Sequence, residues 1–430
     1  MTSLNKNKNL ILVSFIIILS VLLFTTCINN EATEKSSITN PNGEQYAGSG
    51  ACRNCHKDIY DGYINTAHYS TSDSASKKNI KGSFDANKNT FSFNDHIKLP
   101  AEVKVVMEER DSGLFQVAYI NGIEKKTGRF DITIGSGRKA QTYLYWRGNQ
   151  LLQLPISYFT ATGSWANSPG YPYDQIKFNR LVPSHCLECH STIFTVLSVD
   201  KSQSSSWRDA FVFFDHNKTI YGIGCERCHG PAAKHVEFQS KHPEEKKGRY
   251  IINPGLLARQ QNLDACALCH SGIRDNLKPV FSFITGDTLS NYFSPGPAID
   301  TTNSEVHGNQ YGLLIASKCF KMSQTMNCSS CHNPHIKEKE DPALFSQRCM
   351  TCHSVQHNNF CKIAPPVGTS ITNNCIDCHM PIKASKLVNL LASGKPTPTP
   401  LQVRSHLITI YPEESRKILA SMKAAQKISP

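Results

Sequence analysis

Cysteine and histidine residues recur at one fixed spacing along this 430-residue chain, where the pattern Cys-x-x-Cys-His occurs seven times. Two cysteines three positions apart lie on one side of a helical turn, so both thiols can bond to one planar group. The histidine that follows is then aimed at the centre of that group. This spacing is typical of haem c attachment, in which two thioethers hold the porphyrin and the imidazole ligates the iron.

We therefore predict seven covalently bound haem c groups. The attachment cysteines are Cys52, Cys55, Cys186, Cys189, Cys225, Cys228, Cys266, Cys269, Cys328, Cys331, Cys349, Cys352, Cys375 and Cys378. The proximal iron ligands are His56, His190, His229, His270, His332, His353 and His379.

Zinc sites and disulfides are the competing interpretations of so many cysteines. Zinc ribbons also use Cys-x-x-Cys pairs, but they do not require a histidine directly after each second cysteine. Disulfides would not repeat one spacing seven times, and thioredoxin-like pairs occur singly within a βαβ unit. Fourteen of the seventeen cysteines lie inside the motif, so the sequence favours haem over both alternatives.

Longer stretches around several motifs resemble the extended haem motifs of the periplasmic multihaem c-type cytochrome superfamily. These stretches are Tyr46–His56, Cys225–His235, Cys328–His335 and Cys375–Pro381. The superfamily includes the tetrahaem hydroxylamine-linked electron carrier, hydroxylamine oxidoreductase and pentahaem nitrite reductase. The resemblance extends over roughly residues 46–410 and implies electron transfer or redox catalysis on a haem array. The chain has no Cys-x-x-Cys-Lys motif, which argues against the nitrite reductase activity.

Ten histidines lie outside the motifs and could act as distal iron ligands. The resemblance implies this role for four of them: His68, His235, His335 and His406. His307 lies in a polar stretch, and His357 lies between the sixth and seventh motifs, so both are further candidates. His185 directly precedes Cys186 and is either the seventh ligand or the start of the motif turn, with His216 a weaker substitute.

His335 is expected to ligate a haem other than that of its own motif. His332 already occupies the proximal face of the haem held by Cys328 and Cys331. A residue three positions later lies on the same side of the backbone and cannot cross that porphyrin. Pro334 fixes the local backbone and aims the imidazole outward, toward a second haem. His96 and His242 are interpreted as surface residues.

The number of distal ligands separates two functional hypotheses. Seven haems with two histidine ligands each would be saturated and suited to electron transfer between a quinol-linked membrane donor and a periplasmic or surface acceptor. One haem with an open position would instead permit a reductase or oxidoreductase acting on a small nitrogen or sulfur compound. Arg138, Lys139, Tyr143 and Arg147 could line such a site, or they are solvated sheet residues. A non-enzymatic subunit of a larger complex is the third alternative.

The N-terminal residues predict export. Lys6 and Lys8 precede an apolar run from Leu10 to Phe24, which is shorter than the roughly 20 residues that span a bilayer. The run ends near Cys27, which resembles a lipobox cysteine that becomes acylated. A cleaved secretory signal and an uncleaved anchor are the alternatives. We expect a periplasmic or outer-membrane, lipid-anchored bacterial protein.

The formal net charge of +12 is weak evidence for a nucleic-acid partner. Signal removal takes away two lysines, and seven haems add about 14 propionate charges against about seven from ferric iron, so the holoprotein is expected near neutrality. The chain also has no Arg/Lys-rich run with interleaved aromatic residues. We therefore expect redox proteins and the membrane as partners, and no nucleic acid.

The uneven spacing of the motifs divides the chain. Between the first and second motifs lie β-branched and aromatic runs at 103–106, 114–119, 131–134 and 142–146, with a tight turn expected at Asn121-Gly122. We predict a mainly α fold with much irregular structure, a haem array and a small antiparallel β insertion. The expected segments are a signal peptide at 1–26, a tether at 27–45, a first haem segment at 46–97, a β subdomain at 98–160, a six-haem domain at 161–410 and a C-terminal helix at 411–430.

Cys319 and Cys361 remain as a pair outside both the motifs and the signal. In an oxidising compartment they are expected either to form a disulfide or to remain buried free thiols. The disulfide would connect the fifth and sixth haem segments.

The lipobox interpretation predicts that Cys27→Ser abolishes acylation. Acyl chains contribute about 0.8 kcal/mol per buried methylene to membrane binding, so the variant should move to the aqueous phase on detergent phase separation. A Cys319→Ser variant serves as the matched control and should stay with the detergent phase. Retention of the Cys27 variant in the detergent phase would contradict lipid anchoring.

Overall fold

The computed structural model describes residues 37–95, 99–172, 175–202, 211–296, 299–300, 304–338, 341–354, 356, 360–363 and 369–428. The chain divides into two compact units, Met1–Ile38 and Thr39–Pro430, and the architecture below is that of the second. The predictions for the signal segment, Cys27, His96 and His357 lie outside the described residues. No helix among the residues described is both long and apolar enough to cross a membrane.

An antiparallel four-stranded sheet follows the first haem motif. Its order is β2 (Thr90–Ser92), β3 (Val103–Arg110), β4 (Gly113–Ile120) and β5 (Ile123–Arg129). The turn between β4 and β5 contains Asn121 and Gly122 at φ of 50° and 76°, the left-handed conformation that tight hairpin turns require. The prediction of a turn at this dipeptide is confirmed.

A second sheet of seven strands is built largely from the next residues. Its path is β1 (Ser72–Ser74), β6 (Ile132–Ile134), β7 (Ala140–Arg147), β8 (Gln150–Gln153) and β11 (Arg180–Leu181), and β9 (Ile156–Phe159) pairs with both β7 and β10 (Ser164–Asn167). The short strand β1 is the first strand after the first haem motif and α3, so this sheet is joined to the helical region through the chain itself.

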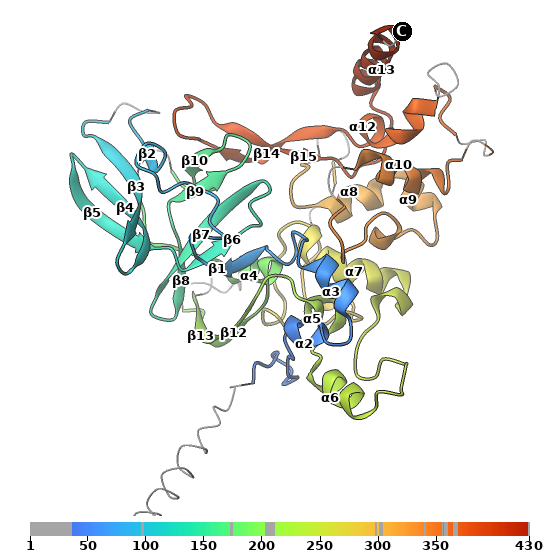
Figure 1. Ribbon diagram of the computed structural model, residues 1–430, viewed down its shortest axis with the longest axis horizontal. Helices are drawn as coiled ribbons and strands as arrows, with labels where there is room; N and C mark the ends of the chain where they lie inside the picture. Colours follow the sequence, from blue (N-terminus) through green and yellow to red (C-terminus); the bar gives the residue numbers. More distant parts are fainter. Residues whose placement is uncertain are drawn as a thin grey trace, which may run out of the picture. The chain divides into compact units, whose positions relative to one another are not determined.

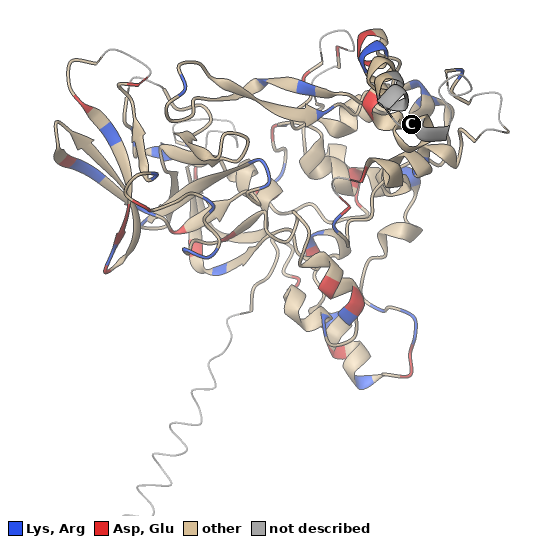
Figure 2. Ribbon diagram, turned by 45° about the horizontal axis from the view of Figure 1, so that its top comes forward, with Lys and Arg blue, Asp and Glu red and all other residues tan. Residues whose placement is uncertain are grey.

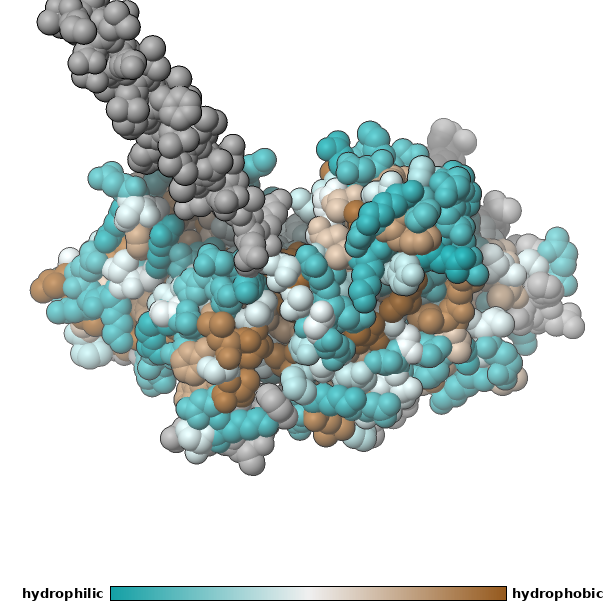
Figure 3. Space-filling view, turned by 90° about the horizontal axis from the view of Figure 1, so that it is seen from below, coloured by the Kyte–Doolittle hydropathy of each residue, from teal (hydrophilic) through white to brown (hydrophobic). Residues whose placement is uncertain are grey.

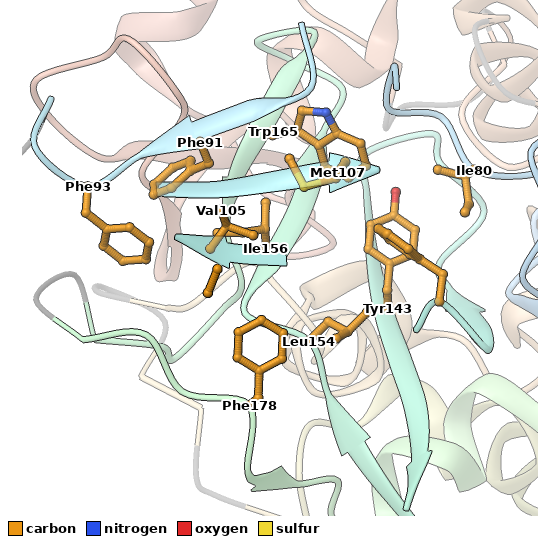
Figure 4. Close-up of a cluster of buried hydrophobic side chains, with 12 residues drawn as sticks. Ile80, Phe91, Phe93, Val105, Met107, Tyr143, Leu154, Ile156, Trp165 and Phe178 are labelled. Carbon is orange, nitrogen blue, oxygen red and sulfur yellow. The ribbon is translucent and has the colours of Figure 1, made fainter. Parts of the chain in front are cut away.

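The largest hydrophobic core lies between these strands (Figure 4). Trp165 is 1% exposed, and its ring is tilted against the rings of Phe130 and Tyr143. Its indole N–H donates to the Ser83 carbonyl. Gln116 is buried in the same region and bonds to the backbone of Ile156 through both its amide nitrogen and its oxygen. The β region therefore has a conventional side-chain core.

Two further hairpins connect strands and helices. β12 (Ser191–Asp200) pairs with β13 (Phe211–Tyr221) between the second and third motifs. β14 (Ile382–Leu390) pairs with β15 (Thr399–Arg404) after the seventh motif. The second hairpin packs on β9 and β10 through Leu390, Ala392 and Leu401, and Figure 1 shows it running from the helical region to the sheets.

Short helices carry the haem motifs and the segments between them (Figure 1). They are α2 (Ser49–Cys52), α3 (Lys57–Tyr63), α4 (Ser184–His190), α5 (Cys225–His229), α6 (Ala233–Lys241), η1 (Pro254–Leu256), α7 (Arg259–His270), η2 (Leu289–Asn291), α8 (Gln310–Ala316), α9 (Lys318–Met322), η3 (Cys328–Ser330), α10 (Pro342–Met350), η4 (Thr369–Asn373), α12 (Cys375–His379) and α13 (Pro412–Ile428). The helix α13 lies in the segment for which the sequence predicts a C-terminal helix.

The prediction of a mainly α fold is wrong, because helices account for 26% of the residues and strands for 27%. Most motif helices extend for little more than one turn, so seven motifs contribute few helical residues. The strands are also more numerous than the four predicted runs. In particular, the β12–β13 hairpin occupies a stretch between two motifs where only helices and loops were expected.

The β core predicts a stability effect separate from haem binding. Truncating the buried indole in Trp165→Ala should cost about 3–5 kcal/mol, because it leaves a cavity and an unpaired Ser83 carbonyl. Ile123→Ala removes a side chain that is 60% exposed on β5 and should change stability by less than about 0.5 kcal/mol. Denaturant unfolding followed by tryptophan fluorescence measures both variants. Equal midpoints for the two would contradict this description of the core.

Candidate haem-binding sites

Four of the seven Cys-x-x-Cys-His motifs lie in a helix that ends at the motif histidine. The helices α4, α5, α7 and α12 each end at the motif histidine, at His190, His229, His270 and His379. After α5 the chain turns at Gly230, whose φ of 77° suits glycine and releases the backbone directly behind the imidazole. Each motif therefore presents two thiols and one imidazole from a compact, short element.

Thiols from different motifs lie against one another. The Cys52 thiol hydrogen-bonds with that of Cys225, joining the first and third motifs. Three further contacts join the second motif to the fourth, the fourth to the fifth and the sixth to the seventh: Cys189 with Cys269, Cys266 with Cys328, and Cys349 with Cys375. The corresponding helices are also neighbours, with α2 against α5, α4 against α7, α7 against η3 and α10 against α12. These contacts leave three groups of motifs. Electrostatic interactions of Cys228 with Cys269 and of Cys331 with Cys352 link the groups into one connected row.

Among the described histidines, three pairs of imidazoles face one another across a gap. The ring centroids of His68 and His270 are 6.3 Å apart. Those of His229 and His335 are 6.1 Å apart, as are those of His332 and His406. In each pair one member is a proximal motif histidine and the other is a predicted distal ligand.

These separations fit one metal ion between two imidazoles. A histidine nitrogen lies about 2.0 Å from a bound metal, and the centroid of its ring lies about 1.2 Å further back, so two opposed rings should have centroids about 6.4 Å apart. Direct ring stacking would bring the centroids closer, as for Trp146 and His216 at 3.7 Å. The residues present therefore fit a six-coordinate haem iron at these three places.

Hydrogen bonds fix which ring nitrogen is available to a metal. Nδ1 of His229 lies 2.8 Å from the Ile252 carbonyl oxygen, and Nδ1 of His379 lies 2.9 Å from that of Thr409. A carbonyl can only accept, so Nδ1 carries the proton and the lone pair is on Nε2. His235 makes the same bond, at 2.7 Å to the Arg249 carbonyl. These three histidines therefore present Nε2, as a haem ligand must.

Burial keeps the facing imidazoles neutral, which is the form that binds metal. It lowers the pKa of His68 and of His406 to about 4 in each case. Burial also lowers the pKa of the opposed partners His270, His332 and His335. At neutral pH these five rings have lone pairs ready for ligation.

The second motif lies near two other imidazoles. Nδ1 of His190 contacts the Thr71 hydroxyl at 2.9 Å, and the ring interacts electrostatically with both His270 and His307. Burial lowers the pKa of His307 as well. No sequence motif indicates Thr71 as the partner of His190; the one feature that distinguishes it is its position three residues after His68.

The remaining predicted distal candidates are distributed outside these pairs. His185 lies in the first turn of α4. His216 donates from Nε2 to the Gly148 carbonyl at 2.6 Å and stacks on Trp146, so its Nε2 is already occupied. His242 stacks on Phe238 near the end of α6. The structure therefore does not bring His216 or His242 into the row of motifs.

Buried charges inside the motifs join neighbouring motif helices. Glu188, in the second motif, is 2% exposed, and Arg227, in the third, is 9% exposed. Their side chains are 3.8 Å apart, and Arg227 also donates to the Glu188 backbone carbonyl. The Glu188 carboxylate accepts from Asn276 and from the Phe281 N–H, while burial raises its pKa and Arg227 lowers it. The variable positions of Cys-x-x-Cys-His thus hold the second and third motifs together.

Similar contacts hold the other motifs. Glu226 accepts from the backbone N–H groups of Ala47 and Gly48, which fixes the segment before the first motif. Arg404, at the end of β15, pairs with Asp377 and donates to two backbone carbonyls of the seventh motif region, close to His406. Charged residues at the variable positions were the available sequence signal for these contacts.

The motif region has too little side-chain core for its size. The buried clusters beside the motifs are small, and one contains Ile371 as its single buried member. Large apolar side chains that follow motif histidines by a few residues are exposed to solvent, including Ile59 at 50%, Ile273 at 60% and Ile336 at 45% exposure. Figure 3 shows hydrophobic residues open on the surface and inside a recess of one face. Porphyrin faces would cover such surface and complete the core.

The zinc and disulfide alternatives do not fit the described residues. No cluster of three or more His, Cys, Asp or Glu side chains within that part of the chain could hold a metal ion by itself. Of the two alternatives left open for Cys319 and Cys361, the structure has the free thiols and not the disulfide. Cys319 interacts with Cys352, whereas Cys361 packs beside Ile371 and interacts with Cys378, so the two lie among different motifs.

The four residues suggested for an oxyanion site do not converge. Tyr143 is fully buried in the β core. Arg138 donates to the Asn65 carbonyl and Lys139 to that of Gln402. Arg147 bonds to Gln150 in the hairpin of β7 and β8. These side chains serve the β region rather than a common pocket.

The Glu188–Arg227 pair predicts a stability effect within the haem region. Glu188→Gln leaves the buried Arg227 without its counter-charge and should cost about 3–5 kcal/mol. Glu237→Gln removes a carboxylate of the same kind from the exposed pair with Lys241 on α6 and should leave the stability nearly unchanged. Denaturant unfolding followed by Soret absorbance compares the two. A Glu188 variant as stable as the control would show that the pair does not hold the motifs together.

Two similarities to known proteins bear on this site. The family model described as cytochrome c554 and c-prime matches residues 173–230, which contain the second and third motifs. A C-type polyheme cytochrome of Geobacter sulfurreducens, OmcC, is 25% identical over 169 residues, or 39% of this chain. The match spans a fifth (20%) of the length of that relative. No solved structure matches the chain significantly. The repeated motifs, the facing imidazoles and these two partial similarities together support a multihaem c-type cytochrome with covalently bound haem c.

Proposed function

We propose that the chain binds seven haem c groups and transfers electrons along them in a periplasmic or outer-membrane respiratory chain. The observation that carries this proposal is the set of facing imidazoles, because each opposes a motif histidine across a gap that suits one iron. An iron with two such ligands has no open position for substrate. The arrangement therefore favours electron transfer over catalysis at these three places.

The proposed ligand pairs join motifs that are distant in sequence. His68 follows the first motif and opposes His270 of the fourth. His335 follows the fifth motif and opposes His229 of the third. His406 follows the seventh motif and opposes His332 of the fifth. Each distal ligand would thus hold a neighbouring haem beside its own segment, which shortens the path between successive redox centres.

The thiol contacts suggest the order of transfer. Contacts connect the first motif to the third and the fourth to the fifth, and weaker electrostatic interactions connect the third to the fourth through Cys228 and Cys269. The fifth and sixth motifs interact through Cys331 and Cys352, and the sixth contacts the seventh. We propose a row in the order 1-3-4-5-6-7, with the second motif beside the fourth.

A bound haem supplies a reversible one-electron couple whose potential depends on its ligands and on its burial. The residues of the chain supply the rest. At the three places where imidazoles are paired, they would hold the iron from both sides and keep it low-spin. Carbonyls that accept from Nδ1 orient the proximal rings, and the buried pair of Glu188 and Arg227 keeps two motifs at a fixed distance.

The redox partners are proposed from the positions at which motif cysteines are exposed. Cys55, in the first motif, and Cys352, in the sixth, are the exposed motif cysteines among the described residues. Haem edges near these two positions could reach other redox proteins, so we propose a quinol-linked membrane donor at one of them and a periplasmic or surface acceptor at the other.

Haem content is the direct test of the proposal. Mass spectrometry of the mature protein should show seven covalent haems, each adding about 0.6 kDa. Electron paramagnetic resonance of the oxidised protein should show mainly low-spin iron. Fewer than seven haems, or a majority of high-spin signals, would contradict the seven-haem electron-transfer proposal.

The ligand assignment predicts the effect of His335→Ala. One low-spin signal should become high-spin, because the iron opposite His229 loses its second imidazole. All haems should stay attached, and the midpoint potential of that haem should rise. Electron paramagnetic resonance and a spectroelectrochemical titration measure these changes.

His242→Ala is the matched control for this experiment. Its imidazole stacks on Phe238 and faces Glu244, away from the motif pairs, so the spectrum should not change. An unchanged spectrum in the His335 variant would show that His335 is not a ligand. Loss of the haem held by Cys328 and Cys331 would instead assign His335 to folding or to haem insertion.

A further inference from the structure

A cavity of about 360 Å³ lies beside the fourth motif, between the end of α7 and the start of α8. Ser271, which follows the motif histidine directly, lines one side of it together with Arg274. Asn309 and Tyr311 line the opposite side at the start of α8. Gln310, between these two residues, donates from its side-chain amide to the Val306 carbonyl. The cavity therefore adjoins a proximal iron ligand, and no step proposed above uses it.

Arg274 brings a positive charge to this cavity without a matching anion. Its Nε is buried and has no hydrogen-bond partner. Asp264 attracts the guanidinium electrostatically, but the Asp264 carboxylate accepts from Gln260 and from the Leu289 N–H instead. Burial lowers the pKa of Arg274, so its environment is poorly solvated. A partly buried cation of this kind is stable only if an anion compensates it.

Two other polar side chains that line the cavity have hydrogen-bond donors that are free among the described residues, whereas their acceptor oxygens are already used. The Asn309 side-chain oxygen already accepts from the Gly312 N–H at 2.9 Å, which leaves the amide nitrogen as a donor. The Tyr311 oxygen accepts from Gln260 at 3.3 Å, and its O–H has no acceptor among the described residues. Arg274, Asn309 and Tyr311 thus form a set of N–H and O–H donors, which selects for oxygen anions.

Glycine at two positions keeps room for this set. A Cβ on Gly296 would lie 3.2 Å from the Arg274 Nε. A Cβ on Gly312 would lie 2.6 Å from the Asn309 side-chain oxygen and 2.7 Å from Ile299 Cδ1. Larger residues at either place would displace the donors or close the cavity.

We propose that Arg274, Asn309 and Tyr311 bind an oxyanion group next to the fourth motif. The proposal rests on the haem assignment above, since two sources could supply the group. A propionate of a neighbouring haem would be held permanently, and the guanidinium would then influence the potential of that haem. A small free oxyanion from solution would be held reversibly.

Three variants of the holoprotein test the proposal. Arg274→Gln removes the charge, and Tyr311→Phe removes one donor while keeping the ring. Arg147→Gln removes the same charge from the exposed end of β7 and is the control. Each protein is first checked for covalent haem content. It is then titrated spectroelectrochemically and, when oxidised, with sodium nitrite and with sodium sulfite.

Two outcomes support the proposal and identify the source. If a propionate is bound, the midpoint potential of one haem falls in Arg274→Gln, because loss of a positive charge favours ferric iron, and neither anion changes the wild-type spectrum. If a free oxyanion is bound, the wild type shows a saturable spectral change, and Arg274→Gln weakens its binding at least tenfold. Tyr311→Phe should give a smaller change in the same direction.

Wild-type behaviour of both Arg274→Gln and Tyr311→Phe, with all haems retained, would overturn the proposal. If Arg274→Gln loses haem, Tyr311→Phe decides: a potential or an anion affinity that differs from that of Arg147→Gln supports the site, and equality overturns it. A wild-type protein with fewer than seven haems would contradict the haem proposal instead, so the two failures are distinguishable.

Discussion

The opposition of two imidazoles across a gap of fixed width is the constraint on which the haem region depends. His270, His229 and His332 each face a histidine from a different part of the chain, with ring centroids 6.1–6.3 Å apart. Such a gap persists only if the backbone behind both rings is held in place. The Nδ1 bonds to carbonyls and the buried position of the rings provide that support. Because the side chains themselves leave the gap open, the core of this region is completed by the cofactor rather than by packed aliphatic residues.

Charged residues inside and beside the motifs hold neighbouring motifs together. Glu188 and Arg227 connect the second and third motifs, and Arg348 pairs with Glu338 while donating to the Cys331 carbonyl, which connects the sixth motif to the fifth. Figure 2 shows acidic and basic residues interspersed in both the strand and the helical parts of the ribbon. The buried pairs matter most, because loss of either partner leaves an uncompensated charge away from water. The surface charges around them contribute little to stability.

The sequence predicts the proximal ligands and nominates distal candidates, since both carry a fixed spacing or a recognisable local pattern. It could not determine that His68 faces His270, because that pairing depends on how segments far apart in the chain pack together. The fold class was wrong for a related reason. The repeated single-turn motifs suggested a helical protein. The β12–β13 hairpin lies between the second and third motifs and the β14–β15 hairpin follows the seventh, and neither was predicted. The sequence also left the state of Cys319 and Cys361 open, because spacing alone does not reveal that the two cysteines lie among different motifs.

The contacts between thiols of different motifs have a consequence for how the protein must be made. In an oxidising compartment, two thiols in contact are prone to form a disulfide, and a disulfide would remove both from thioether formation. Cys52 with Cys225 and Cys349 with Cys375 would be exposed to this side reaction as soon as the folded arrangement forms. Assembly therefore has a required sequence: the cysteines must be kept reduced, and each motif must receive its porphyrin before its neighbour in the row closes on it. Folding of the haem region is then the last step of maturation rather than the first.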